Sequence, residues 1–124
     1  MKTIHISENV PAPIGPYSIA VSKNNFIFTS GQIGMDVYGN LVDGGIKGQT
    51  KQVLENLKAI LDEGGSSLEH ILKTTVFLKD IIDFAEMNEV YGQYLMTSAP
   101  ARSTVEVCNL PKGALVMIDV IAYK

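Results

Sequence analysis

Arg102, Thr104 and Glu106 alternate within residues 100–107, a run typical of a β-strand, so their side chains share one face. A half-buried arginine is costly unless it meets an anion. Its planar guanidinium binds a carboxylate through two parallel hydrogen bonds. Arg102 therefore either forms an internal ion pair with Glu106 or Asp119 or receives a small carboxylate ligand. The second alternative would make the chain a binding protein or an enzyme.

Four further residues are candidates for a ligand site. Ser30 and Gly31 end a predicted strand, where a glycine lets a ligand approach the backbone, although a plain strand end or bulge is the alternative. Tyr17 follows a rigid Gly-Pro turn and either walls a pocket or caps the core. Asn88 lies in a predicted helix, where Asn is a poor helix former, and borders its apolar stripe. For Asn88, a role in binding or at an interface competes with a plain surface position.

The other reactive residue types form no recognisable centre. His5 and His70 are far apart and have no cysteine or carboxylate at metal-ligand spacing, so no metal site is expected. No serine stands in a nucleophile elbow, because the residues around Ser30 lack the leading glycine of that motif. Cys108 is interpreted as a small buried hydrophobe.

Composition limits the function classes. The 124 residues fit a single domain over 1–124, with 46% hydrophobic and 19% charged residues. The net charge of -3 and the absence of a basic run make nucleic acid an improbable partner. No stretch approaches the roughly 20 apolar residues of a membrane span. The single cysteine and the lack of a signal peptide predict a cytoplasmic location.

An α+β fold must position the candidate residues. Apolar residues at helical spacing predict a helix over residues 46–63, and a second helix is expected to begin at Asp83 with Glu86 in a capping box. Ser66 and Glu69 have the same capping-box spacing. Strands are predicted over residues 3–6, 18–22, 26–31, 71–79, 102–107 and 115–122, with a hairpin turn at residues 23–25. Together these elements predict a mixed sheet of about six strands with two helices on one face.

Strand alternation divides the last two strands between two faces. Ser103 and Val105, with Val116, Ile118 and Val120, are predicted to face the helices. Arg102, Thr104 and Glu106 are predicted to share the other face with Met117 and Asp119. That second face is neither plainly core nor plainly solvent, which is typical of a surface that meets a ligand or another subunit.

Several short blocks occur together and in a characteristic order. They cover residues 12–17, 29–33, 73–80, 83–88, 100–107 and 110–112. In these blocks the sequence resembles the Rid family of reactive intermediate/imine deaminases, also called YjgF-like or endoribonuclease L-PSP, over nearly the whole chain. The resemblance implies a chorismate-mutase-like subunit of the bacillus type. Three such subunits would form a homotrimeric barrel with ligand clefts between neighbours.

The resemblance also implies an activity and a set of site residues. It implies a 2-iminobutanoate/2-iminopropanoate deaminase, which converts 2-imino or enamine acids to 2-keto acids and ammonia without a cofactor. Arg102 would hold the substrate carboxylate, and Tyr17 would come from the neighbouring subunit. The full candidate set is Tyr17, Ser30, Asn88, Arg102 and Thr104 as catalytic residues, with Gly31, Ser103, Met117 and Asp119 in substrate binding.

Two departures from the family pattern leave alternatives open. Thr104 stands where deaminating members usually carry cysteine, and Met117 stands where they carry a glutamate thought to position water. Asp119 lies two residues further along the same strand, roughly 6–7 Å away. A weak deaminase, a non-catalytic trimer that binds small carboxylates, and a ribonuclease that inhibits translation therefore compete. The acidic balance counts against the ribonuclease.

Overall fold

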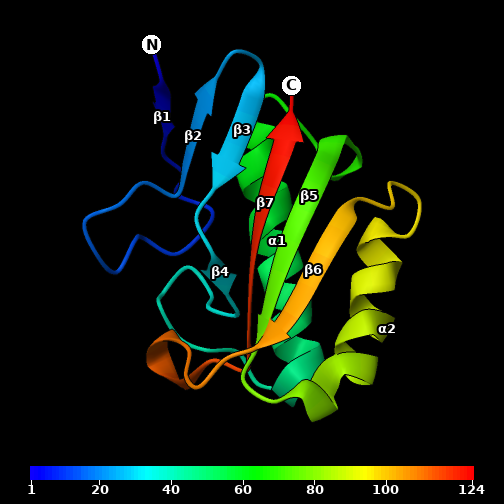
Figure 1. Cartoon of the computed structure of the whole chain (residues 1–124). Helices are drawn as coiled ribbons and strands as arrows, with labels where there is room; N and C mark the ends of the chain where they lie inside the picture. The colour runs from blue at the N-terminus through cyan, green and yellow to red at the C-terminus, as the bar shows by residue number, and fades with distance from the viewer.

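One mixed sheet with two helices behind it forms the molecule in the computed structural model, which describes residues 1–124 (Figure 1). The strand order is β1-β2-β3-β7-β5-β6, and β4 pairs with β7 beyond the end of β3. Every pairing is antiparallel except that of β5 with β6. The predicted α+β class is confirmed. The strands are β1 (Thr3–His5), β2 (Ala20–Lys23), β3 (Phe26–Thr29), β4 (Gln32–Ile33), β5 (Ile71–Leu78), β6 (Ala101–Glu106) and β7 (Val116–Tyr123).

The predicted hairpin between β2 and β3 is confirmed. Asn24 and Asn25 have φ angles of 51° and 73°, in the left-handed region that asparagine tolerates better than most residues. Two consecutive positive φ angles define the turn whose twist matches that of a hairpin. The local sequence therefore sets the register of the first two long strands.

Both helices bury an apolar stripe against the same side of the sheet. Helix α1 (Gly45–Glu63) places Val53, Leu54, Leu57 and Leu61 in the core with no exposed surface. Helix α2 (Phe84–Leu95) buries Met87, Val90, Tyr91 and Leu95. Each fully buried aliphatic side chain contributes about 1.5–3 kcal/mol relative to an exposed one. This shared core fixes where α2 lies and hence where its polar residues point.

Neither predicted capping box forms. Ser66 donates its hydroxyl to the carbonyl of Tyr123 (2.5 Å), so it joins the turn after α1 to the last strand. Asp83 makes no side-chain cap at α2, whereas Asp80 accepts the N–H of Ile82 (3.0 Å) in the short 3₁₀ turn before the helix. At Ser66 a hydrogen bond to a distant carbonyl replaces the expected cap, and before α2 the side-chain cap comes from Asp80 rather than from Asp83.

The predicted division of β6 between the two faces is wrong. Thr74 of β5 pairs with both Arg102 and Val120, so these side chains lie on one face, and Val120 is buried under the helices. Arg102 and Thr104 therefore face α2. Ser103 pairs with Thr75, which pairs with Asp119, so these three lie on the open face. Alternation along β6 sets only which side chains lie together, and its pairing with β5 decides which face they take.

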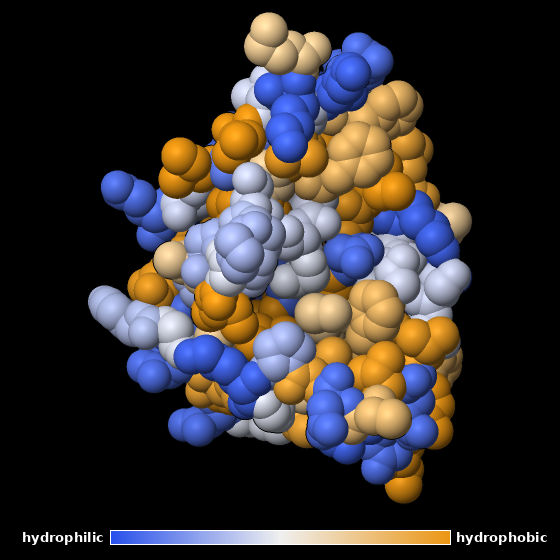
Figure 2. Space-filling view, turned by 60° about the vertical axis from the view of Figure 1, so that its left-hand side comes forward, coloured by the Kyte–Doolittle hydropathy of each residue, from blue (hydrophilic) through white to orange (hydrophobic).

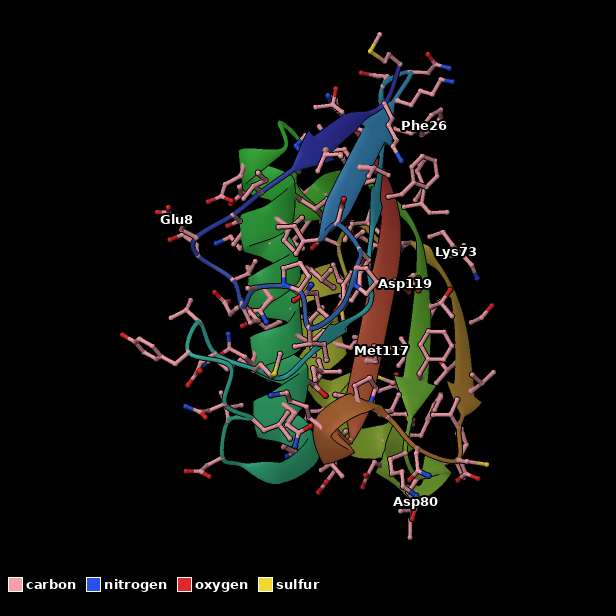
Figure 3. All side chains as sticks on the ribbon, turned by 90° about the vertical axis from the view of Figure 1, so that its left-hand side faces the viewer. Glu8, Phe26, Lys73, Asp80, Met117 and Asp119 are labelled. Carbon is pink, nitrogen blue, oxygen red and sulfur yellow. The ribbon has the colours of Figure 1, made fainter.

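The open face of the sheet is partly apolar. Phe26, Phe28 and Val105 are each between 42% and 45% exposed. In the side-on view of Figure 3, Phe26 and Lys73 lie on the side of the sheet away from the helices. Lys73 donates from Nζ to the hydroxyl of Ser103 (2.7 Å). Figure 2, an oblique view, shows hydrophobic residues interspersed with hydrophilic ones. Neither helix combines the length and the hydropathy that a membrane crossing requires.

Candidate functional site

Arg102 lies half-buried between β6 and α2. Its Nη1 donates to Oδ1 of Asn88 (2.6 Å). The guanidinium carbon lies 4.8 Å from the ring centre of Tyr91 and 5.4 Å from that of Phe84, within the range of cation–π attraction. Tyr91 is held in turn by a 2.8 Å hydrogen bond between its hydroxyl and that of Thr74. Neutral groups on a rigid helix therefore position the cation.

No carboxylate of the chain neutralises Arg102. Glu106 accepts the N–H of Ile81 instead (2.8 Å), and Asp119 lies on the opposite face of the sheet. The single salt bridge of the molecule joins Lys47 and Glu89 (2.9 Å). Of the two alternatives for Arg102, the internal ion pair with Glu106 or Asp119 is thus excluded. Most of the guanidinium N–H groups remain available to an anion from outside the chain.

Thr104 lies next to Arg102 on the same face. Its hydroxyl is buried and has no hydrogen-bond partner. A buried hydroxyl without a partner costs about 1–3 kcal/mol of stability. Packing of the core alone therefore does not explain why a threonine stands at position 104. Thr104 belongs to the Arg102 group by position.

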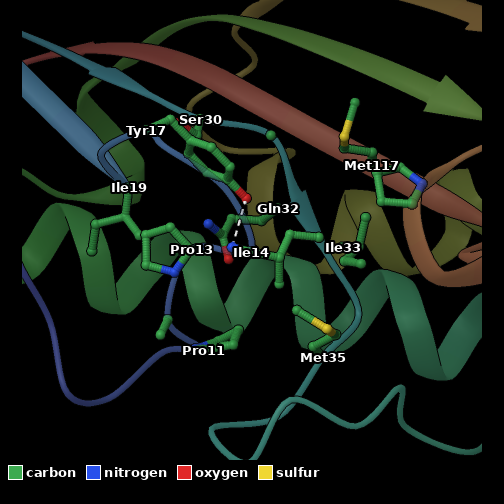
Figure 4. Close-up of a pocket in the computed structure, with 13 residues that line it drawn as sticks. Pro11, Pro13, Ile14, Tyr17, Ile19, Ser30, Gln32, Ile33, Met35 and Met117 are labelled. Atoms are coloured by element: carbon green, nitrogen blue, oxygen red, sulfur yellow. Dashed lines mark hydrogen bonds between the residues drawn. The ribbon is translucent and has the colours of Figure 1, made fainter.

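A second group of candidate residues surrounds a cavity of about 330 Å³ (Figure 4). It lies where the segment before β2, the end of β3, β4 and the start of β7 meet. No charged side chain lines it. The lining residues are Pro11, Ala12, Pro13, Ile14, Tyr17, Ile19, Ser30, Gly31, Gln32, Ile33, Met35, Pro111 and Met117.

A β-bulge places Ser30 and Gly31 beside this cavity. Three residues lie between Phe28 and Gln32, whereas two lie between their partners on β7, Ile121 and Ile118. Within the bulge the hydroxyl of Thr29 accepts the N–H of Val120 (3.0 Å) and closes the ladder. The displaced backbone leaves Ser30 and Gly31 outside the regular pairing.

The two bulge residues have different capacities. Ser30 donates its hydroxyl to the carbonyl of Ser18 (2.5 Å), so its proton is committed to holding the loop before β2. The N–H of Gly31 donates to no carbonyl of the chain and is free for a ligand oxygen. A Cβ at Gly31 would lie 2.7 Å from Sδ of Met117, so the two residues share one tightly filled corner.

Tyr17 forms the outer wall of the cavity and is 46% exposed. Its N–H donates to the carbonyl of Gly15 (2.9 Å) within the turn. Its hydroxyl accepts the N–H of Ile14 (3.3 Å), the dashed line of Figure 4. The phenolic proton therefore remains available as a donor to a ligand.

Two polar residues of α1 support the cavity and were not predicted from the sequence. Asn56 is buried and donates to the carbonyl of Met35 (3.0 Å). Gln49 accepts the N–H of Leu115 (2.8 Å), and its backbone would lie 2.8 Å from a Cβ at Gly34. Both amides interrupt the apolar stripe of residues 46–63, and that interruption was the available signal.

Within one chain the candidates form two separate groups. Arg102, Asn88 and Thr104 lie at the β6 edge on the helix side. Tyr17, Ser30, Gly31 and Met117 line the cavity. Strand β5 lies between β6 and β7, which makes about 10 Å of lateral separation. The two groups can act together only if two copies of the chain meet.

Two remaining candidates belong to neither group. Ser103 and Asp119 lie on the open face, and Asp119 does not line the cavity. Burial raises the pKa of Asp119, an effect that the charge of Lys73 partly opposes. Cys108, interpreted as a buried hydrophobe, is exposed, so that prediction is wrong.

Comparison with known proteins identifies relatives over the full length. The sequence model of the endoribonuclease L-PSP family matches residues 7–124. A RutC family protein of Pyrococcus horikoshii is 55% identical over 100% of this chain and 99% of its own. The 2-iminobutanoate/2-iminopropanoate deaminase of Bos taurus is 45% identical over 100% of this chain and 91% of its own. The crystal structure of Escherichia coli TdcF with bound serine superposes with a TM-score of 0.92, at 38% identity and 98% coverage of both chains.

Proposed function

This chain belongs to the endoribonuclease L-PSP family, also known as YjgF, RutC or Rid, and we propose that it hydrolyses 2-imino acids to 2-keto acids and ammonia. The observation that carries the proposal is Arg102, a half-buried cation that neutral groups position and no acid of the chain neutralises. A bidentate pair with a substrate carboxylate would satisfy its planar fork. The deaminase relative at 45% identity and the neighbour with bound serine agree with a small carboxylate ligand.

The proposed active unit is a homotrimer in which Arg102 of one copy completes the cavity of the next. The separation of the two groups within one chain supports this arrangement. The partly apolar open face, with Phe26, Phe28 and Val105 exposed, offers a surface for copies to pack against one another. Identical head-to-tail contacts form a closed ring of three subunits when each contact rotates the next copy by 120°.

The proposed reaction needs no oxidant or reductant. Water adds to the carbon of the C=N bond to give a tetrahedral carbinolamine. The C–N bond then breaks as the C=O bond forms, and nitrogen leaves as ammonia with protons from water. Arg102 would fix the carboxylate, while the Gly31 N–H and the Tyr17 hydroxyl would orient the reacting end. Because imines hydrolyse readily, positioning supplies much of the rate.

A second candidate function is binding without catalysis. The observation that favours it is the absence of any carboxylate from the cavity lining, where Met117 occupies the corner beside Gly31. General acid–base help is typically worth 100- to 10,000-fold, and no carboxylate of the cavity supplies it. The protein would then bind small carboxylate ligands through Arg102 without hydrolysing imines faster than water does.

A trapping assay separates the two candidates. Threonine dehydratase generates 2-iminobutanoate in the presence of semicarbazide, which captures the imine faster than the keto acid. A deaminase lowers the initial rate of semicarbazone formation, and a binding protein leaves it unchanged. Arg102→Lys keeps the charge but loses the fork, so it should abolish most of the effect. RNA incubated with the protein in parallel should remain intact, and cleavage would favour the ribonuclease instead.

Mixed trimers test the shared site. Arg102→Ala removes one group and Gly31→Val fills the other, so each variant alone should be inactive. In randomly mixed trimers about one quarter of the sites would combine two intact groups. Recovery of about that fraction of activity supports a site between copies, and its absence, with trimers confirmed by sedimentation, contradicts it.

A further inference from the structure

Tyr91 and Thr74 place a pair of hydroxyl groups in the apolar core. Tyr91 is 8% exposed, Thr74 is fully buried, and their hydroxyl oxygens lie 2.8 Å apart. The strand residues beside them on this face, such as Val76 and Val120, are apolar and buried. A buried hydrogen-bonded pair is often no more stabilising than two apolar groups of the same shape, whereas one hydroxyl left alone would lack a partner. Stability of the fold therefore does not account for the pair, because phenylalanine and valine would fill the same space.

The hydroxyl pair closes a ring of contacts around Arg102. Thr74 is the partner of Arg102 in the parallel pairing of β5 with β6. Tyr91 extends from α2 to Thr74, and the centre of its ring lies 4.8 Å from the guanidinium carbon of Arg102. The ring cannot turn away from the guanidinium without breaking the hydrogen bond to the strand beside it. The hydrogen bond thus fixes the surface on which the cation rests.

Tyr91 differs in this respect from the other two groups that contact the guanidinium. Phe84, Asn88 and Tyr91 lie at positions i, i+4 and i+7 of α2 and so form one stripe along the helix. Phe84 is 38% exposed and has no polar group that could anchor its ring. The side chain of Asn88 has no hydrogen-bond partner in the chain other than Arg102. Of the three, only Tyr91 ties the guanidinium to a fixed point of the sheet.

A guanidinium that is held in place before a ligand arrives binds more tightly than a mobile one. An arginine side chain has several rotatable bonds, and ordering them on binding weakens the affinity. A two-pronged hydrogen bond to a carboxylate also requires the plane of the guanidinium to be oriented correctly. Because the guanidinium of Arg102 lies over the ring of Tyr91, the contact restricts the cation while its N–H groups stay available.

We propose that Tyr91 is a positioning residue, whose hydrogen bond to Thr74 holds the guanidinium of Arg102 in the orientation that binds a carboxylate. The inference rests on the proposed function for the identity of the ligand. It adds two residues that act through Arg102 without touching the substrate. Removal of both hydroxyls should therefore loosen Arg102 and weaken ligand binding while the core stays intact.

The mobility of Arg102 can be measured directly, because it is the only arginine of the sequence. Protein labelled with ¹⁵N-arginine gives one Nε–H signal in an NMR spectrum, and its relaxation reports the order of this side chain. In the natural protein we expect an order parameter near the value of about 0.85 that is typical of rigid groups. In the double variant Thr74→Val, Tyr91→Phe it should fall below about 0.6, the range of flexible groups.

Tyr94→Phe is the matched control. Tyr94 lies one turn further along α2 and donates its hydroxyl to Glu55 (2.7 Å), so this variant also loses a tyrosine hydrogen bond of the helix. Tyr94 does not contact Arg102, and the order of the Arg102 signal should be unchanged. The double variant is preferred to Tyr91→Phe alone, since the single change leaves the Thr74 hydroxyl buried without a partner and lowers the Tm for that reason.

Calorimetry measures the consequence for binding. 2-Oxobutanoate, the stable 2-keto acid that hydrolysis of 2-iminobutanoate would give, carries the carboxylate that Arg102 would hold. We expect the double variant to bind it at least about fivefold more weakly than the natural protein, because the guanidinium must then be ordered on binding. The Tm of the double variant should be no lower than that of the natural protein. A residue that only supported the fold would show the opposite combination, a lower Tm with an unchanged Arg102 signal.

The order of Arg102 decides the proposal. An Arg102 signal that stays rigid in the double variant overturns it, and so does an unchanged Kd for 2-oxobutanoate. A loosened Arg102 with weaker binding supports it, even if the natural protein leaves semicarbazone formation unchanged in the trapping assay. In that case the proposed deamination fails, while the role of Tyr91 in orienting Arg102 stands.

Discussion

Replacing Asn88 by aspartate should weaken ligand binding while it stabilises the fold. Asn88 presents its side-chain oxygen to Arg102 at 2.6 Å, and aspartate is nearly isosteric. Asn88→Asp therefore gives Arg102 the internal anion that it lacks in the natural sequence. Any external carboxylate must then compete with a partner that is already in place.

The size of the effect follows from the distance and the exposure. Two unit charges 4 Å apart attract by about 4 kcal/mol at an effective dielectric constant of 20. Because Arg102 is only half-buried, water screens the pair, so its net interaction lies between the about 1 kcal/mol of an exposed ion pair and the about 3 kcal/mol of a hydrogen bond to a charged group. That range corresponds to an increase in Kd of about 5- to 150-fold.

Calorimetric titration with 2-oxobutanoate and thermal unfolding measure the two effects on the same samples. Asn88→Ala is the control, since it removes the hydrogen bond to Arg102 without adding charge. We expect Asn88→Ala to lower the Tm and to change the Kd by less than about fivefold. Only the aspartate variant should raise the Tm and weaken binding together.

One result would refute the reasoning about Arg102. If Asn88→Asp binds the keto acid as tightly as the natural protein while its Tm rises, the internal ion pair has formed and the ligand does not use Arg102. Sedimentation at the same concentration shows whether the assembly is unchanged, so that a loss of binding is not mistaken for a loss of subunits.

Three further predictions concern other residues. Met117→Glu should raise the deamination rate of small imino acids by up to about 100-fold, because it places a potential general base beside Gly31. Met96→Glu, at an exposed position, is the control and should have no effect. Equal rates for Met117→Glu and the natural chain would show that positioning alone does the chemistry. Burial raises the pKa of Asp119, so the folded state favours the protonated form and the penalty for its charge develops as pH rises above about 3.8. Asp119→Asn should accordingly increase the urea midpoint at pH 7 but not below pH 3.8, and an equal increase at both pH values would point to packing instead. Burial and the hydrogen bond to Glu55 (2.7 Å) raise the pKa of Tyr94 to about 12. In an ultraviolet titration of the phenols, the ionisation step at the highest pH should therefore disappear in Tyr94→Phe. Persistence of that step would assign it to another tyrosine.

Local patterns predicted those elements whose contacts are local. The stripe of residues 46–63 specifies α1 because helical spacing alone gathers its leucines and isoleucines on one side. Asn24 and Asn25 specify the hairpin because two positive φ angles are needed there. Ser66 failed as a cap because the carbonyl of Tyr123, 57 residues away, captured its hydroxyl. No spacing rule contains that contact.

The faces of β6 depended on a partner that the sequence does not reveal. As an edge strand, β6 is covered only by α2, so it carries a half-buried arginine on its helix side and an exposed valine on the other. Residue types therefore gave the wrong orientation, and the parallel register with β5 gives the right one. The choice between an internal ion pair and an external ligand for Arg102 likewise depended on a contact distant in sequence. The N–H of Ile81 donates to the carboxylate of Glu106, which therefore does not pair with Arg102.

The cavity was only partly foreseeable. Tyr17, Ser30 and Gly31 were identified as candidates, but the bulge that exposes the Gly31 N–H arises from the mismatch between β3, β4 and β7. The supporting amides of Gln49 and Asn56 act through the backbone of Leu115 and Met35, which lie far from them in the sequence. Such contacts exist only once the helix is packed on the sheet.

A crystal structure of the protein with bound 2-oxobutanoate tests the central claim most directly. The account predicts a carboxylate about 2.8 Å from two nitrogens of Arg102 of one copy, with the keto oxygen beside the Gly31 N–H of the next copy and the side chain in the cavity. A ligand whose carboxylate lies away from Arg102, or a site built from a single chain, would contradict it.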